Sequence, residues 1–132
     1  MVNEKVTPMV STDTYLIKLE AGERLLPGLE GLGLEEYEGS MPVGWLIELV
    51  SFGRPIVATE ALEELDRLRY RPADPTEFSI FRREYPEVPV PVMGLYSPRR
   101  GGEPVFFSDS SLLEKDEELE EDFWIPVIKK ML

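Results

Sequence analysis

The chain has 132 residues, a formal net charge of −12, 42% hydrophobic residues and 30% charged residues. This length and balance predict one globular domain that buries roughly two thirds of the surface its unfolded chain would expose. The sequence contains no cysteine and no histidine, which excludes disulfides, thiolate nucleophiles, zinc ribbons, iron–sulfur clusters and serine–histidine triads. Any chemistry would depend on carboxylates, tyrosines, lysines or backbone amides, and no cofactor is expected.

The negative charge also restricts the partners. Nucleic acid requires a basic surface, so direct binding of nucleic acid is not expected. The charge favours docking onto a basic protein surface, including one that normally holds nucleic acid, although solubility alone would also explain it. No apolar run approaches the ~18 residues of a membrane span, and the N-terminus lacks the layout of a signal peptide, so a cytoplasmic location is expected. Twelve prolines and the missing cysteine and histidine suit a heat-adapted source.

The first third of the chain predicts one strand and a long irregular segment. After a short lead-in over residues 1–10, residues 12–19 alternate in the period of two that is typical of a strand. Residues 20–44 contain six glycines and two prolines, which predicts a loop with short helical turns.

The middle of the chain, residues 43–92, carries the strongest pattern. Residues 43–52 are apolar on both faces and predict a central strand. A turn at residues 53–55 precedes a helix with Thr59 as its N-cap, which we expect to end at Pro72. Asp74, Pro75 and Glu77 then have the spacing of a capping box, although a strand is the alternative; we expect a short helical turn that leads into a strand.

The last third predicts a hairpin and a helix. Residues 87–96 alternate valine with proline, which indicates an edge strand or polyproline-like chain. A loop over residues 97–104, with Gly101 and Gly102 at its turn, leads to a returning strand at residues 105–107. We expect a helix from Ser110 or Ser111 to about residue 122 and then a terminal strand or turn.

Together these elements predict an α+β fold: a small mixed or antiparallel, barrel-like sheet with two or three helices in a single domain. Its expected parts are an N-terminal strand and loop (1–42), a strand–helix–strand core (43–108), and an acidic helix with an apolar tail (109–132).

Two groups of residues are candidates for function. Residues 114–122 hold seven acids against one lysine and are either a solvated helix face or a contact surface for a basic partner. The expected partner-binding residues, which include two arginines on a glycine-flanked loop, are Arg99, Arg100, Glu117, Glu118, Glu120, Glu121, Asp122 and Trp124. Glu48 is the one carboxylate whose apolar neighbours predict burial, and it is either a catalytic candidate or the partner of an arginine.

Residues 43–92 resemble the gamma-glutamylcyclotransferase-like family. The similarity is carried by VGWLIEL at residues 43–49, ALEELDRL at 61–68, Tyr70-Arg71-Pro72 and Phe81-Arg82-Arg83. In that family a Y-G-S/T-L loop holds the substrate carboxylate, and a glutamate just after L-D-x-L moves protons while a gamma-glutamyl amine closes into a ring.

Both elements of that chemistry are altered in this chain. Arg69 follows the L-D-x-L sequence, and a guanidinium cannot release its proton at any relevant pH. Leu16, Ile17 and Lys18 stand where the resemblance places the glycine-bearing loop. The resemblance therefore implies the fold of the family without its activity.

Two functions follow as expectations. The first is a non-catalytic regulator that binds a larger protein with a basic surface; by type, such small acidic chains are similar to phage-encoded inhibitors of host enzymes such as RNA polymerase. The alternative is a cyclotransferase-like enzyme that acts on gamma-glutamyl amines through another carboxylate, with Glu48 as its candidate.

Overall fold

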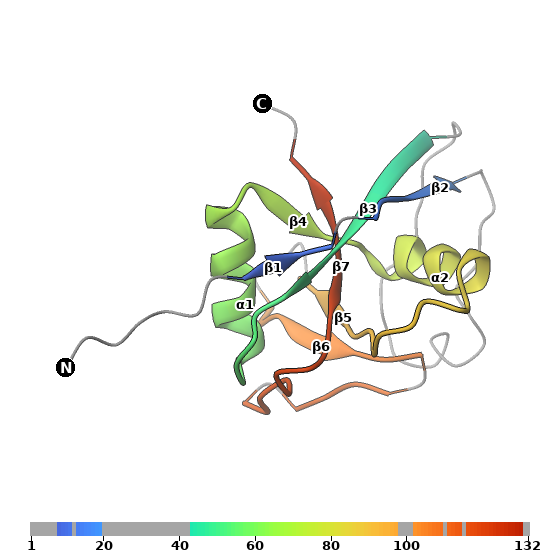
Figure 1. Ribbon diagram of the computed structural model, residues 1–132. Helices are drawn as coiled ribbons and strands as arrows, with labels where there is room; N and C mark the ends of the chain where they lie inside the picture. Colours follow the sequence, from blue (N-terminus) through green and yellow to red (C-terminus); the bar gives the residue numbers. More distant parts are fainter. Residues whose placement is uncertain are drawn as a thin grey trace.

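A computed structural model describes residues 8–11, 13–19, 43–97, 102–109, 111–114 and 116–130 (Figure 1). Within these residues the fold is α+β, a single small domain in which two helices accompany a curled antiparallel sheet, as the sequence predicted. The elements in chain order are β1 (Met9–Val10), β2 (Tyr15–Leu19), β3 (Val43–Ser51), α1 (Ala58–Arg67), β4 (Tyr70–Pro72), α2 (Pro75–Glu84), β5 (Gly94–Tyr96), β6 (Val105–Phe107) and β7 (Ile125–Lys129). None of the described helices is long and apolar enough to cross a membrane.

Strand β3 is the centre of the sheet, which confirms the central strand expected at residues 43–52. It pairs with β1 and β2 along one edge and with β7 along the other, and β7 in turn pairs with β4. All four of these pairings are antiparallel. The terminal segment predicted as a strand or turn is therefore an inner strand of the sheet.

Alternating side chains of β3 enter two separate core clusters. Val50 packs with α1 and the β5–β6 hairpin, in a cluster that includes Ala61 and Leu65. Ile47 and Leu49 point to the other face and pack with α2. This alternation follows directly from the two-residue period of a strand, and it lets one strand hold both helices.

Helix α1 starts and ends earlier than the sequence indicated. Its N-cap is Val57, which has no side-chain cap, so the prediction of Thr59 as the cap is wrong. The helix stops at Arg67 because Arg69 adopts the left-handed conformation, with φ of 65°, and turns the chain into β4. Pro72 lies in β4 and does not end the helix, so that prediction is also wrong.

Helix α2 begins as predicted and runs further. Asp74 accepts a hydrogen bond from the Glu77 amide (2.7 Å), Glu77 accepts one from the Asp74 amide (2.8 Å), and Pro75 occupies the first turn. The expected strand after this cap is wrong, because the chain stays helical to Glu84. Its apolar residues Phe78, Ile80 and Phe81 are fully buried: Ile80 and Phe81 pack with Ile47 and Leu49, and Phe78 packs edge-on against Phe107.

The predicted hairpin near residue 100 is confirmed in its pairing, since β5 and β6 are antiparallel neighbours. Most of its loop, residues 98–101, lies outside the described residues, as do residues 20–42 and the loop predicted there. The extended chain over residues 87–96 forms a strand only at Gly94–Tyr96, with a single bridge from Val92 to Trp124 before it. The alternating prolines explain this limited pairing, because proline donates no hydrogen bond.

Candidate functional site

The acidic segment, residues 114–122, is not the helix that was predicted. Within the described residues 111–114 and 116–124, the chain is extended or turning, and Leu112 and Leu119 form isolated bridges to other parts of the chain. Leu112 bridges Phe107, and Leu119 bridges Ile56, where the Leu119 amide donates to the Ile56 carbonyl at 2.7 Å and the Ile56 amide donates back at 3.2 Å. These long-range bonds take the backbone groups that a helix would need.

The acidic segment nevertheless holds its carboxylates on a fixed backbone. Leu119 is 2% exposed, and the Ser51 hydroxyl donates to the Glu121 carbonyl at 3.3 Å. Around this buried anchor the acidic side chains are all exposed, and none forms an ion pair or hydrogen bond within the described part of the chain: Glu114, Asp116, Glu117, Glu118, Glu120, Glu121 and Asp122. The segment is therefore a ridge of unpaired negative charge.

Trp124 follows this ridge and is half-buried. It packs against the cluster that holds α2, its amide donates to the Pro91 carbonyl at 2.9 Å, and its carbonyl accepts from the Met93 amide at 2.9 Å. The other predicted contact residues, Arg99 and Arg100, lie outside the described residues. The predicted acids thus lie on one anchored segment, and the half-buried Trp124 follows them along the chain.

Glu48 is half-buried on β3, opposite Val127 on β7. Its partner is the Tyr70 hydroxyl, not an arginine; burial, and then the hydrogen bond to Glu48, raise the pKa of Tyr70. Among the described residues no group of three acidic side chains is arranged to hold a metal ion. Glu48 thus has a neutral hydrogen-bond donor, the Tyr70 hydroxyl, as its partner.

Arg69, at the position of the family's glutamate, is exposed at the turn between α1 and β4. Its carbonyl accepts a hydrogen bond from the Lys130 amide at 2.8 Å. Asp66, one turn earlier, binds the Lys130 ammonium, which lowers the pKa of Asp66. Asp66, Arg69 and Lys130 are exposed, whereas Leu65 of the same L-D-x-L sequence is fully buried in the core cluster of α1.

A buried charge cluster lies where β4 leads into α2. Arg71 forms a two-bond ion pair with Glu77, with nitrogen–oxygen distances of 2.8 and 2.9 Å, and its guanidinium lies 5.0 Å from the ring centre of Trp45. Glu77 is 1% exposed. Burial and the neighbouring Glu77 charge raise the pKa of Asp74 to about 6. The capping-box spacing predicted one half of this cluster, whereas the Arg71 partner was missed.

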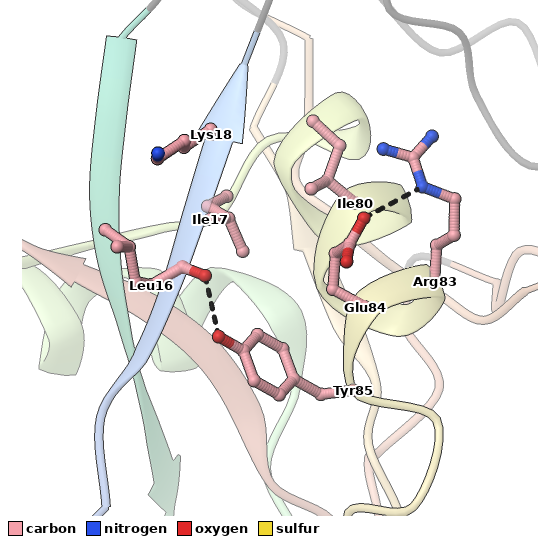
Figure 2. A pocket seen from close by; sticks show the side chains of 7 residues that line it. All are labelled: Leu16, Ile17, Lys18, Ile80, Arg83, Glu84 and Tyr85. Atoms are coloured by element: carbon pink, nitrogen blue, oxygen red, sulfur yellow. Dashed lines mark hydrogen bonds and ion pairs between the residues drawn. The ribbon is translucent and has the colours of Figure 1, made fainter.

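A groove of about 430 Å³ separates β2 from the C-terminal end of α2. Figure 2 shows its strand side, formed by Leu16, Ile17 and Lys18, and its helix side, formed by Ile80, Arg83, Glu84 and Tyr85. The Tyr85 hydroxyl donates to the Leu16 carbonyl across the groove at 2.8 Å, and Arg83 pairs with Glu84 at 3.5 Å. No motif in the sequence predicted the groove directly, although the family resemblance placed a ligand-holding loop at residues 16–18.

Comparison of the chain with protein-family models, with curated proteins and with solved structures finds no match in any of the three. The gamma-glutamylcyclotransferase-like resemblance therefore stays a prediction from the sequence, and function has to be inferred from the ridge, the charge cluster and the groove.

Proposed function

We propose that this chain is a non-catalytic regulator that docks the acidic segment onto the basic surface of a larger protein. One observation carries the proposal: the carboxylates of residues 116–122 are exposed and unpaired within the described chain, while Leu119 fixes the backbone beneath them. A fixed array of charge binds with a smaller loss of conformational entropy than a disordered acidic tail. Nothing in the ridge requires a cofactor.

The partner is a protein whose basic surface ordinarily holds nucleic acid. The net charge of −12 steers the chain towards such a surface, and the ridge offers the carboxylates in place of phosphates. RNA polymerase is the first partner to test, and inhibition by a phage-encoded protein is the biological setting that we infer. In this role the chain contacts no nucleic acid directly.

The decisive experiment compares two triple variants of equal charge. The ridge variant carries Glu117→Gln, Glu118→Gln and Glu120→Gln, and the control carries Asp13→Asn, Glu63→Gln and Glu87→Gln, which are exposed acids outside the ridge. Binding to bacterial RNA polymerase is measured in competition with DNA at 50 and 200 mM salt. Loss of three interfacial charges is expected to weaken binding about tenfold or more.

The control variant should bind within about twofold of the unmodified chain, because long-range charge is screened beyond about 8 Å at physiological salt. Equal losses of affinity in both variants would show that the ridge contributes to binding only through the net charge of the chain. If neither RNA polymerase nor a pull-down from the host lysate gives a stoichiometric partner, the proposal fails.

The groove beside β2 supports a second candidate, a cyclotransferase-like enzyme. It borders Leu16, Ile17 and Lys18, the residues at the position of the family's substrate loop, and it contains the carboxylate of Glu84. This candidate function predicts that the protein releases 5-oxoproline from gamma-glutamyl amines. It also predicts that Glu84→Gln or Glu48→Gln abolishes this turnover. No release from a panel of gamma-glutamyl substrates would eliminate it.

A further inference from the structure

Along each strand of the sheet, the backbone amide and carbonyl of successive residues point alternately towards the two neighbouring strands. Pro126 on β7 shows which residues point which way. Pro126 has no amide hydrogen, and its carbonyl accepts from the Ala73 amide at 3.0 Å, so it faces β4. Its register partner on β3 is Leu49, whose backbone groups point the other way. There the Leu49 carbonyl accepts from the Ser11 amide (2.8 Å), and the Leu49 amide donates to the Ser11 hydroxyl (3.0 Å).

The same alternation fixes which groups of β2 are free. Two residues before Leu49, Ile47 also points towards β2, where its register partner is Tyr15. Tyr15 and Ile17 therefore bond to β3, and the backbone groups of Leu16 and Lys18 point outward. The hydrogen bond that the Leu16 carbonyl accepts from Tyr85 has this direction. Within the described chain, the Leu16 amide and both backbone groups of Lys18 have no partner.

These outward groups face the groove between β2 and α2. Its volume of about 430 Å³ lies within the range of binding pockets. The buried side chains of Ile17 and Ile80 form its apolar floor. Tyr85 reaches the strand edge from the end of α2, so the helix stands beside the edge (Figure 2).

We propose that this groove binds an extended segment of a partner protein, which adds to the sheet as a strand hydrogen-bonded to the Leu16 amide and to both backbone groups of Lys18. Within the described chain this strand edge is unpaired apart from the Leu16 carbonyl, and an unpaired strand edge is a template for another strand. The site is distinct from the acidic segment, which lies away from β2 in Figure 1. It does not depend on the proposed function.

The side chains of β2 define the chemistry of this segment. Ile17 points towards α2, whereas Leu16 and Lys18 are exposed on the other face (Figure 2). A partner residue opposite Ile17 would face the Ile80 floor and should be aliphatic. A residue opposite Lys18 would lie beside its ammonium and should be acidic, because opposite charges on neighbouring strands stabilise the pair. An acidic residue next to an aliphatic one is the expected signature.

The test starts from a phage-displayed library of random nonapeptides selected on the full chain. Enriched peptides should share the acidic–aliphatic pair, and in ¹⁵N-labelled protein they should shift the amides of Leu16 and Lys18 more than those of Tyr15 and Ile17. Lys18→Pro removes only an outward amide, which an edge strand tolerates, and should weaken binding at least tenfold. Lys18→Ala keeps the amide and should weaken binding less than threefold.

The amide shifts are read in the unmodified chain, so they decide the matter even if Lys18→Pro does not fold. The ridge substitutions at residues 117, 118 and 120 should leave peptide affinity unchanged, which separates this site from the proposed function. Failure to enrich any peptide, or enriched peptides that shift amides elsewhere, would overturn the proposal.

Discussion

Replacing Asp74 by asparagine should stabilise the protein at neutral pH, although aspartate is the N-cap of α2. Asp74 and Glu77 place two carboxylates at a largely buried junction, where the Arg71 guanidinium bonds to Glu77. Asparagine is as good an N-cap as aspartate, and its side-chain oxygen can still accept from the Glu77 amide. The substitution removes the excess negative charge and keeps the cap.

The magnitude follows from the pKa of Asp74, which burial and then the Glu77 charge raise from 3.8 to about 6. A rise of this size makes the ionised form of Asp74 about 3 kcal/mol less favourable in the folded state than in the unfolded state. Because the folded state holds the proton more tightly than the unfolded state, the penalty is absent below pH ~4 and fully present above pH ~6. Between pH 7 and pH 5, protonation of Asp74 should stabilise the fold by about 1 kcal/mol.

Urea unfolding of the unmodified chain and of Asp74→Asn, at several pH values from 4.5 to 7.5, tests this directly. The variant should be more stable by about 1–2 kcal/mol at pH 7.5, after allowance for the polarity of the amide, and the difference should shrink towards pH 5. Asp116→Asn, at an exposed site without a partner in the described chain, is the matched control for the change of charge and should alter stability by at most about 0.5 kcal/mol.

Two results would refute this reasoning. One is a loss of stability in Asp74→Asn at pH 7.5, which would show that the ionised carboxylate is favourable as a cap. The other is a stability difference that does not vary with pH. Asp74→Ala removes the cap itself and should cost about 1 kcal/mol relative to Asp74→Asn at every pH.

Three further substitutions test the packing around this core. Glu77→Gln leaves a half-buried guanidinium without its carboxylate, so urea unfolding should show a loss of about 3 kcal/mol, and a loss below 1 kcal/mol would contradict the buried pair. Gly94→Ala places a Cβ into the ring of Phe107 and should destabilise the protein by about 1–3 kcal/mol. In the control Gly44→Ala, the added Cβ is 3.9 Å from its nearest neighbours, so the loss of stability should exceed the change in strand propensity by at most a few tenths of a kcal/mol. Equal losses of stability in the two variants would refute the overlap at Gly94. Arg69→Gly relieves the left-handed backbone at φ 65° and should raise the melting temperature by a few degrees, while a decrease would show that the arginine side chain holds the turn.

The sequence by itself determined the elements whose signals are local. The α2 cap is specified by Asp74, Pro75 and Glu77, which lie within four positions and satisfy one another's backbone groups. The central position of β3 followed from a run that is apolar on both faces, and the β5–β6 hairpin from its flanking strands. The acidic composition of the ridge was also evident, because it depends on residue identity alone.

Only the tertiary structure decided the shape of the ridge, the partner of Glu48 and the existence of the groove. Local signals favoured a helix up to residue 122, but Leu119 bonds to Ile56, and burial of that leucine outweighs helix propensity. The groove depends on Tyr85 reaching Leu16, which is 69 positions away. Contacts of such separation leave no periodicity or spacing in the sequence, because they are selected by what the folded sheet brings together.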